Sequence, residues 1–395
     1  MKTKLGSELP THIPSITGLR FIAAAMVFVS HIAQNRIFNS PDTNEAFYQI
    51  FNPAGWVGVE FFFILSGFVL TWSLKDNDTV RSFWRRRVVK IFPNHLVTWF
   101  AGLLLMIIAG EALNLFHVIP SAFLVHTWIP RMDALTGTNG PNWSLGCELV
   151  FYLCFPYIYR FIRKIRPEHL WGWFAAVTAT IFAWTSLVFF VFPERPGIVW
   201  ADMPFWHFWG VYNLPPVRML EFTLGILLAR IVLSGRWISL SWSSSIGIFA
   251  VGYLAVLLVP PEYGMTTVAA IPLSMVIATA ATADLRGTPS PLRGPRMIWL
   301  GEISFAFYLV HYLILHFTLK ALGENVSWSL FVGLCVSTVL LLVTLYFANL
   351  LYRWVELPAM RRWGRSPDGM KHGSLVCPPV EKIDDDTRSP SGAAS

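Results

Sequence analysis

The chain has 395 residues, of which 54% are hydrophobic and only 13% are charged, and its formal net charge is +7. Soluble domains carry roughly 25% charged residues, so a soluble globule of this composition could not cover its apolar surface. The composition therefore excludes an ordinary soluble protein, and the apolar runs predict an all-α, polytopic membrane protein.

About ten apolar segments are near the ~20 residues needed to cross ~30 Å of hydrocarbon. With a cytoplasmic N-terminus and loops on alternating sides, 24 of the 30 Lys and Arg residues fall in cytoplasmic segments or at the cytoplasmic ends of spans. This bias is the positive-inside pattern, so both termini are predicted to be cytoplasmic, and the basic excess reflects topology rather than nucleic-acid binding. The predicted spans are 17–35, 54–74, 91–110, 143–162, 171–192, 211–233, 241–259, 264–283, 299–320 and 326–351.

Residues 15–363 are expected to form one transmembrane domain. Residues 1–14 form a polar cytoplasmic segment, and the apolar run after them lacks a small-residue cleavage site, so we expect a retained first span. Residues 364–395 are predicted to form a disordered cytoplasmic tail. The four cysteines include no C-x-x-C pair, so neither a disulfide framework nor a metal site is expected.

The first span, in "GLRFIAAAMVFVSHIAQ", carries Arg20 and His31. Eleven helical residues complete about three turns, which places both side chains on one face, ~16 Å apart along the axis. Arg20 then lies near the cytoplasmic surface and His31 in the outer half of the membrane. A lone arginine near a helix end often only reaches the interface, and a lone buried histidine is often structural, so both alternatives stay open.

The second span carries Glu60, six residues in from its outer end, and Ser66 in "FILSGF". Ionisable groups inside spans are expensive and are functional candidates by default. Ser66 is a candidate nucleophile for an acyl-enzyme, although a Ser-Gly pair in a span more often serves helix packing.

The start of the third span is strongly basic, in "FWRRRVVKIFPNH". Such a cluster either anchors the chain to anionic lipid or binds a phosphorylated ligand through guanidinium groups. The polar residues Asn94 and His95 follow inside the span and are not needed for anchoring, which favours a binding site. The cations are Arg85, Arg86, Arg87 and Lys90.

Residues 113–130 are apolar but contain His117, Pro120 and His126. A span here would reverse the charge bias of every later loop. We therefore expect an interfacial or re-entrant segment on the outer side.

Glu148 lies five residues into the fourth span from its outer end, at an estimated depth similar to those of His31 and Glu60. The three side chains could therefore converge. A carboxylate that accepts a hydrogen bond from one imidazole nitrogen leaves the other as a general base. A purely structural buried network remains the alternative.

Two later spans also carry ionisable residues. Arg218 and Glu221 are three residues apart on one helix, where they can neutralise each other. His311, in "ISFAFYLVHY", is a second buried imidazole and an accessory candidate for the site.

Six motifs in order resemble the integral-membrane acyltransferase-3 family. The Arg20 and His31 spacing matches the opening of its first span, "GVEFFFILSGFVLTW" its second span, and "RRVVKIFP" its R-R-x-x-R-I-x-P segment, with Lys90 in place of the last arginine. "NWSLGCELVFYLCFP" resembles the W-S-L-x-x-E-x-x-F-Y segment and matches Glu148, while "GEISFAFYLVHY" and "YRWVELP" resemble the closing motifs.

The resemblance implies O-acyl transfer from a cytoplasmic acyl-CoA, with acetyl-CoA expected, to a hydroxyl of a surface polysaccharide, lipopolysaccharide or peptidoglycan sugar. One branch acylates macrolide antibiotics, and the text around Lys90 resembles that branch. Acyl-CoA is then a co-substrate, with no permanently bound cofactor. The expected partners are the bilayer, acyl-CoA and a small-molecule or glycan acceptor, in a multi-pass protein of the bacterial plasma (inner) membrane.

The expected mechanism places the CoA phosphates on Arg85, Arg86, Arg87 and Lys90, with the pantetheine arm passing Arg20. His31 then removes the proton of the acceptor hydroxyl, and Glu148 orients the imidazole. The main alternative is a proton-coupled transporter, which would also bury His, Glu and Arg in spans. A structural membrane scaffold is the third hypothesis.

Overall fold

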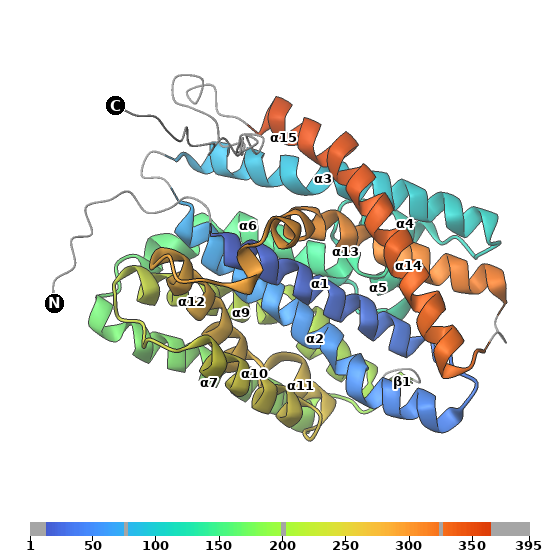
Figure 1. The fold of residues 1–395 in the computed structure, drawn as a ribbon, viewed down its shortest axis with the longest axis horizontal. Coiled ribbons are helices and arrows are strands. Elements are labelled where there is room, and N and C mark those ends of the chain that lie inside the picture. Colours follow the sequence, from blue (N-terminus) through green and yellow to red (C-terminus); the bar gives the residue numbers. More distant parts are fainter. Residues whose placement is uncertain (1–12, 75–77, 199–202, 324–326, 365–395) are drawn as a thin grey trace, which may run out of the picture.

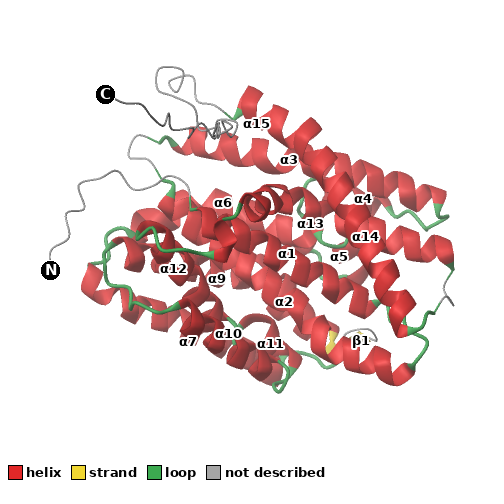
Figure 2. Cartoon of the chain, viewed as in Figure 1, coloured by secondary structure: helices red, strands yellow, loops and turns green. Residues whose placement is uncertain are grey.

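The computed structural model describes residues 13–74, 78–198, 203–323 and 327–364. Its long helices form one bundle and run roughly along its longest axis (Figure 1), and the described chain outside the loops is almost entirely helical (Figure 2). The strands found there are β1 (Gly197–Ile198) and β2 (Met203–Pro204), which pair antiparallel with Gly197 opposite Pro204. The predicted all-α membrane protein is confirmed, whereas most of the predicted terminal segments, 1–12 and 365–395, lie outside the described residues.

A helix is present at each of the ten predicted spans. Eight helical stretches of the described chain are long and apolar enough to cross a membrane. The other two spans correspond to α9, which carries three charged residues, and to the shorter α10. The ten are α1 (Pro14–Gln34), α2 (Pro41–Trp72), α3 (Val80–Ile108), α6 (Asn142–Ile162), α7 (Leu170–Val191), α9 (Pro215–Leu233), α10 (Trp242–Val256), α12 (Ala270–Leu285), α13 (Pro295–Leu322) and α14 (Leu330–Leu351).

Shorter elements connect these helices. Two of them, η3 and η5, are single π-helical turns, which frequently occur at functional sites. The shorter elements are α4 (Leu115–Ala122), η1 (His126–Trp128), α5 (Met132–Thr136), η2 (Pro167–His169), α8 (Phe205–Phe208), η3 (Trp209–Asn213), α11 (Pro261–Thr266), η4 (Pro291–Arg293), η5 (Tyr352–Glu356) and α15 (Leu357–Trp363).

The centre of the bundle is built on α2 and α9, which pack backbone against backbone. A Cβ atom added to Gly67 of α2 would lie 1.9 Å from the carbonyl oxygen of Phe222, and one added to Gly225 of α9 would lie 1.9 Å from that of Ile64. Small residues allow this close approach between membrane helices. Glu60 of α2 and Arg218 and Glu221 of α9 are consequently held deep inside the bundle.

Contacts between helix ends agree with the predicted alternation of loops. At the predicted cytoplasmic side, the backbone N–H of Ser15 at the start of α1 donates to Asp284 at the end of α12, over 2.8 Å. At the opposite side, the Tyr253 hydroxyl of α10 donates to the Ile50 carbonyl of α2 over 2.6 Å. Each contact joins ends that the alternation puts on one side. We call these the inner and outer ends of the bundle.

Residues 113–130 form no span and fold back into the bundle. The carbonyl of Ala122 accepts from His95 Nε2 of α3 over 3.1 Å, and a little further along the chain Asn139 Nδ2 donates to the Leu309 carbonyl of α13 over 2.8 Å. His95 and Leu309 lie well inside their helices, roughly 20 Å from the outer ends at the helical rise. The prediction that residues 113–130 form no span is therefore confirmed, and α6, which follows, starts deep inside the bundle.

Candidate active site

The two buried imidazoles of the sequence analysis meet each other. His31 Nδ1 of α1 lies 2.9 Å from His311 Nε2 of α13, and the ring centroids are 5.0 Å apart. His311 Nδ1 lies 2.6 Å from the carbonyl oxygen of Tyr308, one turn earlier on α13. His311 is fully buried, whereas His31 remains partly exposed. Of the imidazole pair, His31 and His311, only His31 is therefore open to a ligand.

Glu148 does not take the place beside His31 that the sequence analysis gave it. The hydroxyl of Ser144 lies 2.9 Å from that of Tyr308, which sets the level of α6 against α13. Glu148 follows one helical turn later, about 6 Å closer to the inner end. The equal-depth estimate is wrong because it assumed that the fourth span begins at the membrane surface.

Glu148 instead faces cations of the inner half. The charges that act on its carboxylate are Arg20 of α1 and Arg87 and Lys90 of α3, and its hydrogen-bond donor is the Tyr152 hydroxyl, at 3.2 Å. We call Arg20, Arg87, Lys90, Glu148 and Glu356 the inner cluster. Arg20 and Lys90, which separate motifs predicted as donor-binding, thus both act electrostatically on one carboxylate.

Glu356, at the end of η5, completes the inner cluster. Its carboxylate pairs with the Lys90 ammonium and accepts from Asn94 Nδ2 over 2.6 Å. Glu356 and Asn94 are both buried. In the sequence, Glu356 stood out only as part of a closing motif. The available signal for its role was a carboxylate in "YRWVELP", close after the last apolar run.

The predicted arginine cluster divides between solvent and bundle. Arg85 is exposed, and Arg86 pairs with Asp78, the residue before the N-cap of α3. The Arg87 guanidinium lies over the rings of Phe83 and Tyr152, at 5.4 and 5.8 Å from their centroids. Arg87 consequently belongs to the inner cluster, while Arg85 and Arg86 stay at the inner surface.

Glu60 lies in a third group rather than beside His31. Its carboxylate is fully buried, has no hydrogen-bond partner within the described residues, and feels the charges of Arg218 and Glu221. Arg218 and Glu221 approach to 2.7 Å, so their predicted mutual neutralisation is confirmed. The Arg218 guanidinium also lies 5.0 Å from the Phe63 ring centroid. Glu60, Arg218 and Glu221 together form a buried group of ionisable residues at the α2–α9 contact.

Ser66 lies in the inner half, near the hydroxyl of Tyr152. Ser30 of α1, next to His31, instead bonds the carbonyl of Asn52 on α2. Ser66 is therefore ~20 Å along α2 from the level of His31. A serine–histidine nucleophile pair is not formed.

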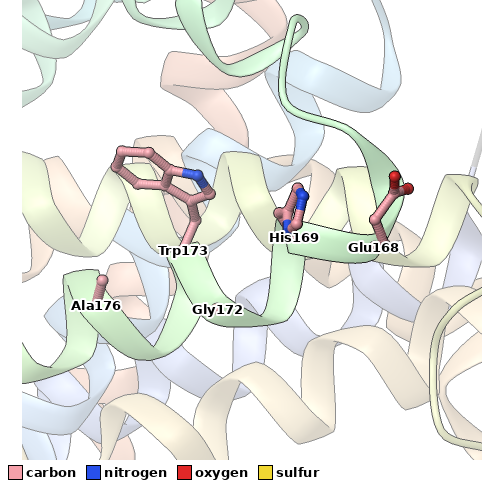
Figure 3. Close-up of a pocket in the computed structure, with 5 residues that line it drawn as sticks. All are labelled: Glu168, His169, Gly172, Trp173 and Ala176. Carbon is pink, nitrogen blue, oxygen red and sulfur yellow. The ribbon is translucent and has the colours of Figure 1, made fainter.

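The predicted site residues lie apart from the open depressions on the surface of the bundle. One such depression is lined along one face of η2 and α7 (Figure 3), and none of the predicted site residues borders it. Across the parts of the chain that the structure describes, no three His, Cys, Asp or Glu side chains gather as metal ligands would. The residues that line the surface depression are Glu168, His169, Gly172, Trp173 and Ala176.

Comparisons with known proteins give the same family as the sequence motifs. Residues 13–347 match the acyltransferase-3 family, described as "Acyltransferase domain". The chain is 39% identical to "Acyltransferase MdmB" of Streptomyces mycarofaciens over 89% of this chain and 93% of that protein. It is 25% identical to "Putative peptidoglycan O-acetyltransferase YrhL" of Bacillus subtilis, over 90% of this chain and 56% of that protein.

A further relative is "Exopolysaccharide production protein ExoZ" of Rhizobium meliloti, 23% identical over 78% of this chain and 90% of that protein. No solved structure matches the chain. The family match covers most of the sequence, and the first of these relatives is similar along nearly its whole length. The chain therefore belongs to the integral-membrane acyltransferase-3 family.

Proposed function

We propose that this membrane acyltransferase moves a short acyl group, with acetyl expected, from acyl-CoA to a hydroxyl of a natural product such as a macrolide. The observation that carries the proposal is the position of His31. Its ring is held by His311, remains partly exposed, and shares α1 with Arg20, which reaches the inner cluster. One helix thus links a candidate base in the bundle to a set of cations near its inner end.

The inner end supplies a site for an anionic donor. Arg85 and Arg86 lie at the surface, and Arg87, Lys90 and Arg20 continue the positive charge inward. Guanidinium and ammonium groups bind phosphates through charge-assisted hydrogen bonds. In this structure, Arg86 forms an ion pair with Asp78, and Lys90 forms one with Glu356. The phosphates of acyl-CoA would therefore compete with two carboxylates for these cations.

In the proposed reaction, the pantetheine arm extends past Arg20 and brings the thioester to His31. His31 Nε2 takes the proton of the acceptor hydroxyl as its oxygen attacks the thioester carbonyl carbon. The C–S bond then breaks, and the thiolate leaves with the proton that His31 held. General base catalysis of this kind contributes ~10²–10⁴-fold, and positioning of the two substrates supplies further rate.

Direct transfer is supported over an acyl-enzyme. Ser66 is the serine that the motifs put forward, and it lies near Tyr152 in the inner half, away from His31. A nucleophile needs a base within hydrogen-bond reach. No intermediate on Ser66 is therefore included in the reaction.

The proposal also includes the identity of the acceptor and of the membrane. The text around Lys90 resembles the macrolide branch, and the relative of 39% identity aligns over 93% of its length. A hydroxyl of a cell-surface glycan is the second candidate, because relatives are described as peptidoglycan and exopolysaccharide proteins. The charge bias of the loops fits insertion in the bacterial plasma (inner) membrane.

The test uses membranes that contain the full chain, radiolabelled acetyl-CoA and a panel of macrolides and glycans. We expect label on an acceptor hydroxyl, and a loss of at least about 100-fold for His31→Ala. His169→Ala, at the exposed start of α7, is the matched control and should retain activity. Full activity of His31→Ala would remove His31 from the chemistry. Solute flux driven by a pH gradient, without acyl transfer, would support the transporter instead.

A further inference from the structure

We propose that His311 is a positioning residue that fixes the His31 ring in the one tautomer able to accept a proton at Nε2. This inference rests on the proposed function of His31 as the base. It assigns His311 a role through His31, because His311 itself is fully buried and meets no exposed surface.

The Tyr308 carbonyl can only accept a hydrogen bond. His311 Nδ1 lies 2.6 Å from this oxygen, so Nδ1 must carry the hydrogen. A neutral imidazole has one N–H, which leaves a lone pair on His311 Nε2. That atom lies 2.9 Å from His31 Nδ1. His31 Nδ1 is therefore the donor of the second hydrogen bond, and His31 Nε2 carries the free lone pair.

The surroundings keep the chain of hydrogen bonds in this direction. His311 forms no ion pair with any carboxylate in the described residues, so nothing stabilises a second proton on a ring that water does not reach. Its ring stacks on Phe307, with centroids 6.0 Å apart and planes 9° from parallel. The Tyr312 ring meets the His31 ring edge-on at 5.3 Å. Aromatic packing thus fixes both ring planes.

His311 has the role that the carboxylate has in a Ser-His-Asp triad. It accepts a hydrogen bond from the catalytic imidazole, but it is a neutral acceptor. An acceptor on one imidazole nitrogen sets the tautomer and orientation of the ring. Among the described residues, Glu148 accepts from Tyr152, Glu60 has no hydrogen-bond partner, and His311 is the side chain that bonds His31 Nδ1. Loss of His311 should let the His31 ring rotate or adopt the tautomer with hydrogen on Nε2.

Three substitutions separate positioning from packing. His311→Gln places an amide oxygen about where Nε2 lies, so it can still accept from His31. His311→Asn is shorter; its amide reaches the Tyr308 carbonyl but not His31. His311→Leu fills the volume with no acceptor. We expect kcat within about tenfold of wild type for Gln, and a loss of about 100-fold or more for Asn and Leu.

The KM values for acetyl-CoA and for the acceptor should change little in all three variants, because His311 contacts neither substrate. Each variant is first checked for a single symmetric peak in detergent size-exclusion chromatography. Asn or Leu with wild-type kcat, or well-folded Gln as inactive as Leu, would overturn the inference. If His31→Ala itself remains active, the proposed function fails first; if it is inactive while His311→Leu is active, only the present inference fails.

Solid-state NMR of the protein with ¹⁵N-labelled histidine gives a second measurement that does not depend on turnover. Protonated and unprotonated ring nitrogens have well-separated ¹⁵N shifts. We expect the His31 signals, assigned by their loss in His31→Ala, to show hydrogen on Nδ1 in the wild type and in His311→Gln. Hydrogen on Nε2 of His31 in the wild type would contradict the inference.

Discussion

Lys90 and Glu356 form an ion pair between α3 and η5, 266 residues apart in the chain. Glu356 also accepts from Asn94 Nδ2, a buried group. The pair therefore closes the inner end of the bundle by joining the third predicted span to the turn that follows the last one. The inner end owes part of its stability to one carboxylate.

Removal of that carboxylate should destabilise the protein. In Glu356→Ala, the Asn94 amide and the Lys90 ammonium lose their partner, and a buried polar group left unsatisfied costs ~1–3 kcal/mol. We expect a lower Tm in thermal unfolding of the detergent-solubilised protein. Glu168→Ala, which removes an exposed carboxylate at η2, is the control and should leave Tm unchanged. Equal Tm values for the two variants would show that the pair contributes nothing to the fold.

Helix positions were the part of the fold that local sequence could predict, because ~20 apolar residues define a span. The residues at which the helices begin and end were less predictable. The helix α2 starts at Pro41 rather than at 54, because the Ser40 side chain caps it by accepting from the Thr43 N–H over 3.2 Å. Polar residues outside the hydrocarbon extend a helix without entering the apolar count. The same applies to α3, which starts at Val80 rather than at 91.

Contacts between distant helices were beyond local sequence. Helical periodicity relates Arg20 to His31 on one helix, but it carries no information on which helix lies opposite. The His31–His311 bond and the Lys90–Glu356 pair depend on that neighbour relation. The depth of Glu148 was misjudged because the residues before α6 turn back into the bundle through contacts with α3 and α13.

The Asp78–Arg86 pair provides a test of the donor site. If the surface arginines bind the phosphates of acyl-CoA, Asp78 competes with them, and Asp78→Asn should lower the KM for acetyl-CoA. The pair is partly buried at the inner surface, and a surface ion pair is worth up to ~1 kcal/mol, or about fivefold. Arg86→Ala should raise the same KM, measured by initial-rate kinetics in membranes.

Arg163→Ala serves as the control, because Arg163 is an exposed cation at the predicted cytoplasmic end of α6. It should leave the KM unchanged. If Asp78→Asn, Arg86→Ala and Arg163→Ala all give the wild-type KM, the cluster only anchors the chain to anionic lipid.

At the outer end, Glu111 predicts a pH-dependent contribution to stability. Its carboxylate lies 2.5 Å from Lys320 Nζ and 3.2 Å from His316 Nε2. Burial raises the pKa of Glu111, but the hydrogen bonds from Lys320 and His316 outweigh it and hold that pKa below its ordinary value of 4.5. A lowered folded-state pKa gives stability that is present above the ordinary value and is lost as the pH falls through the folded value.

The Tm advantage of wild type over Glu111→Gln should therefore be constant near neutral pH and should shrink below roughly pH 4.5. We expect a small difference at neutral pH, up to ~1 kcal/mol, because the pair is partly exposed. Glu194→Gln, in an exposed loop, should follow the wild-type curve at every pH. A Tm difference that grows on acidification would contradict the assignment.

Glu148→Gln decides between the two roles considered for this carboxylate. Glu148 is acted on by the charges of Arg20, Arg87 and Lys90 rather than of His31, so its charge would oppose the proposed anionic donor and would not set the imidazole tautomer. Glutamine keeps an oxygen that accepts from Tyr152 but removes the charge. We expect the KM for acetyl-CoA to fall by about fivefold, the equivalent of ~1 kcal/mol, with kcat within about tenfold of wild type.

Tyr152→Phe is the matched control for Glu148→Gln, because it deletes the hydrogen bond to Glu148 over 3.2 Å and keeps the carboxylate charge. Its KM should stay at the wild-type value, which separates charge from hydrogen bonding. A loss of about 100-fold or more in kcat for Glu148→Gln, at constant KM, would instead show that the carboxylate acts on the chemical step. Because His31 and Glu148 lie at different levels of the bundle, we expect their substitutions to change different kinetic parameters: kcat for the imidazole and KM for the carboxylate.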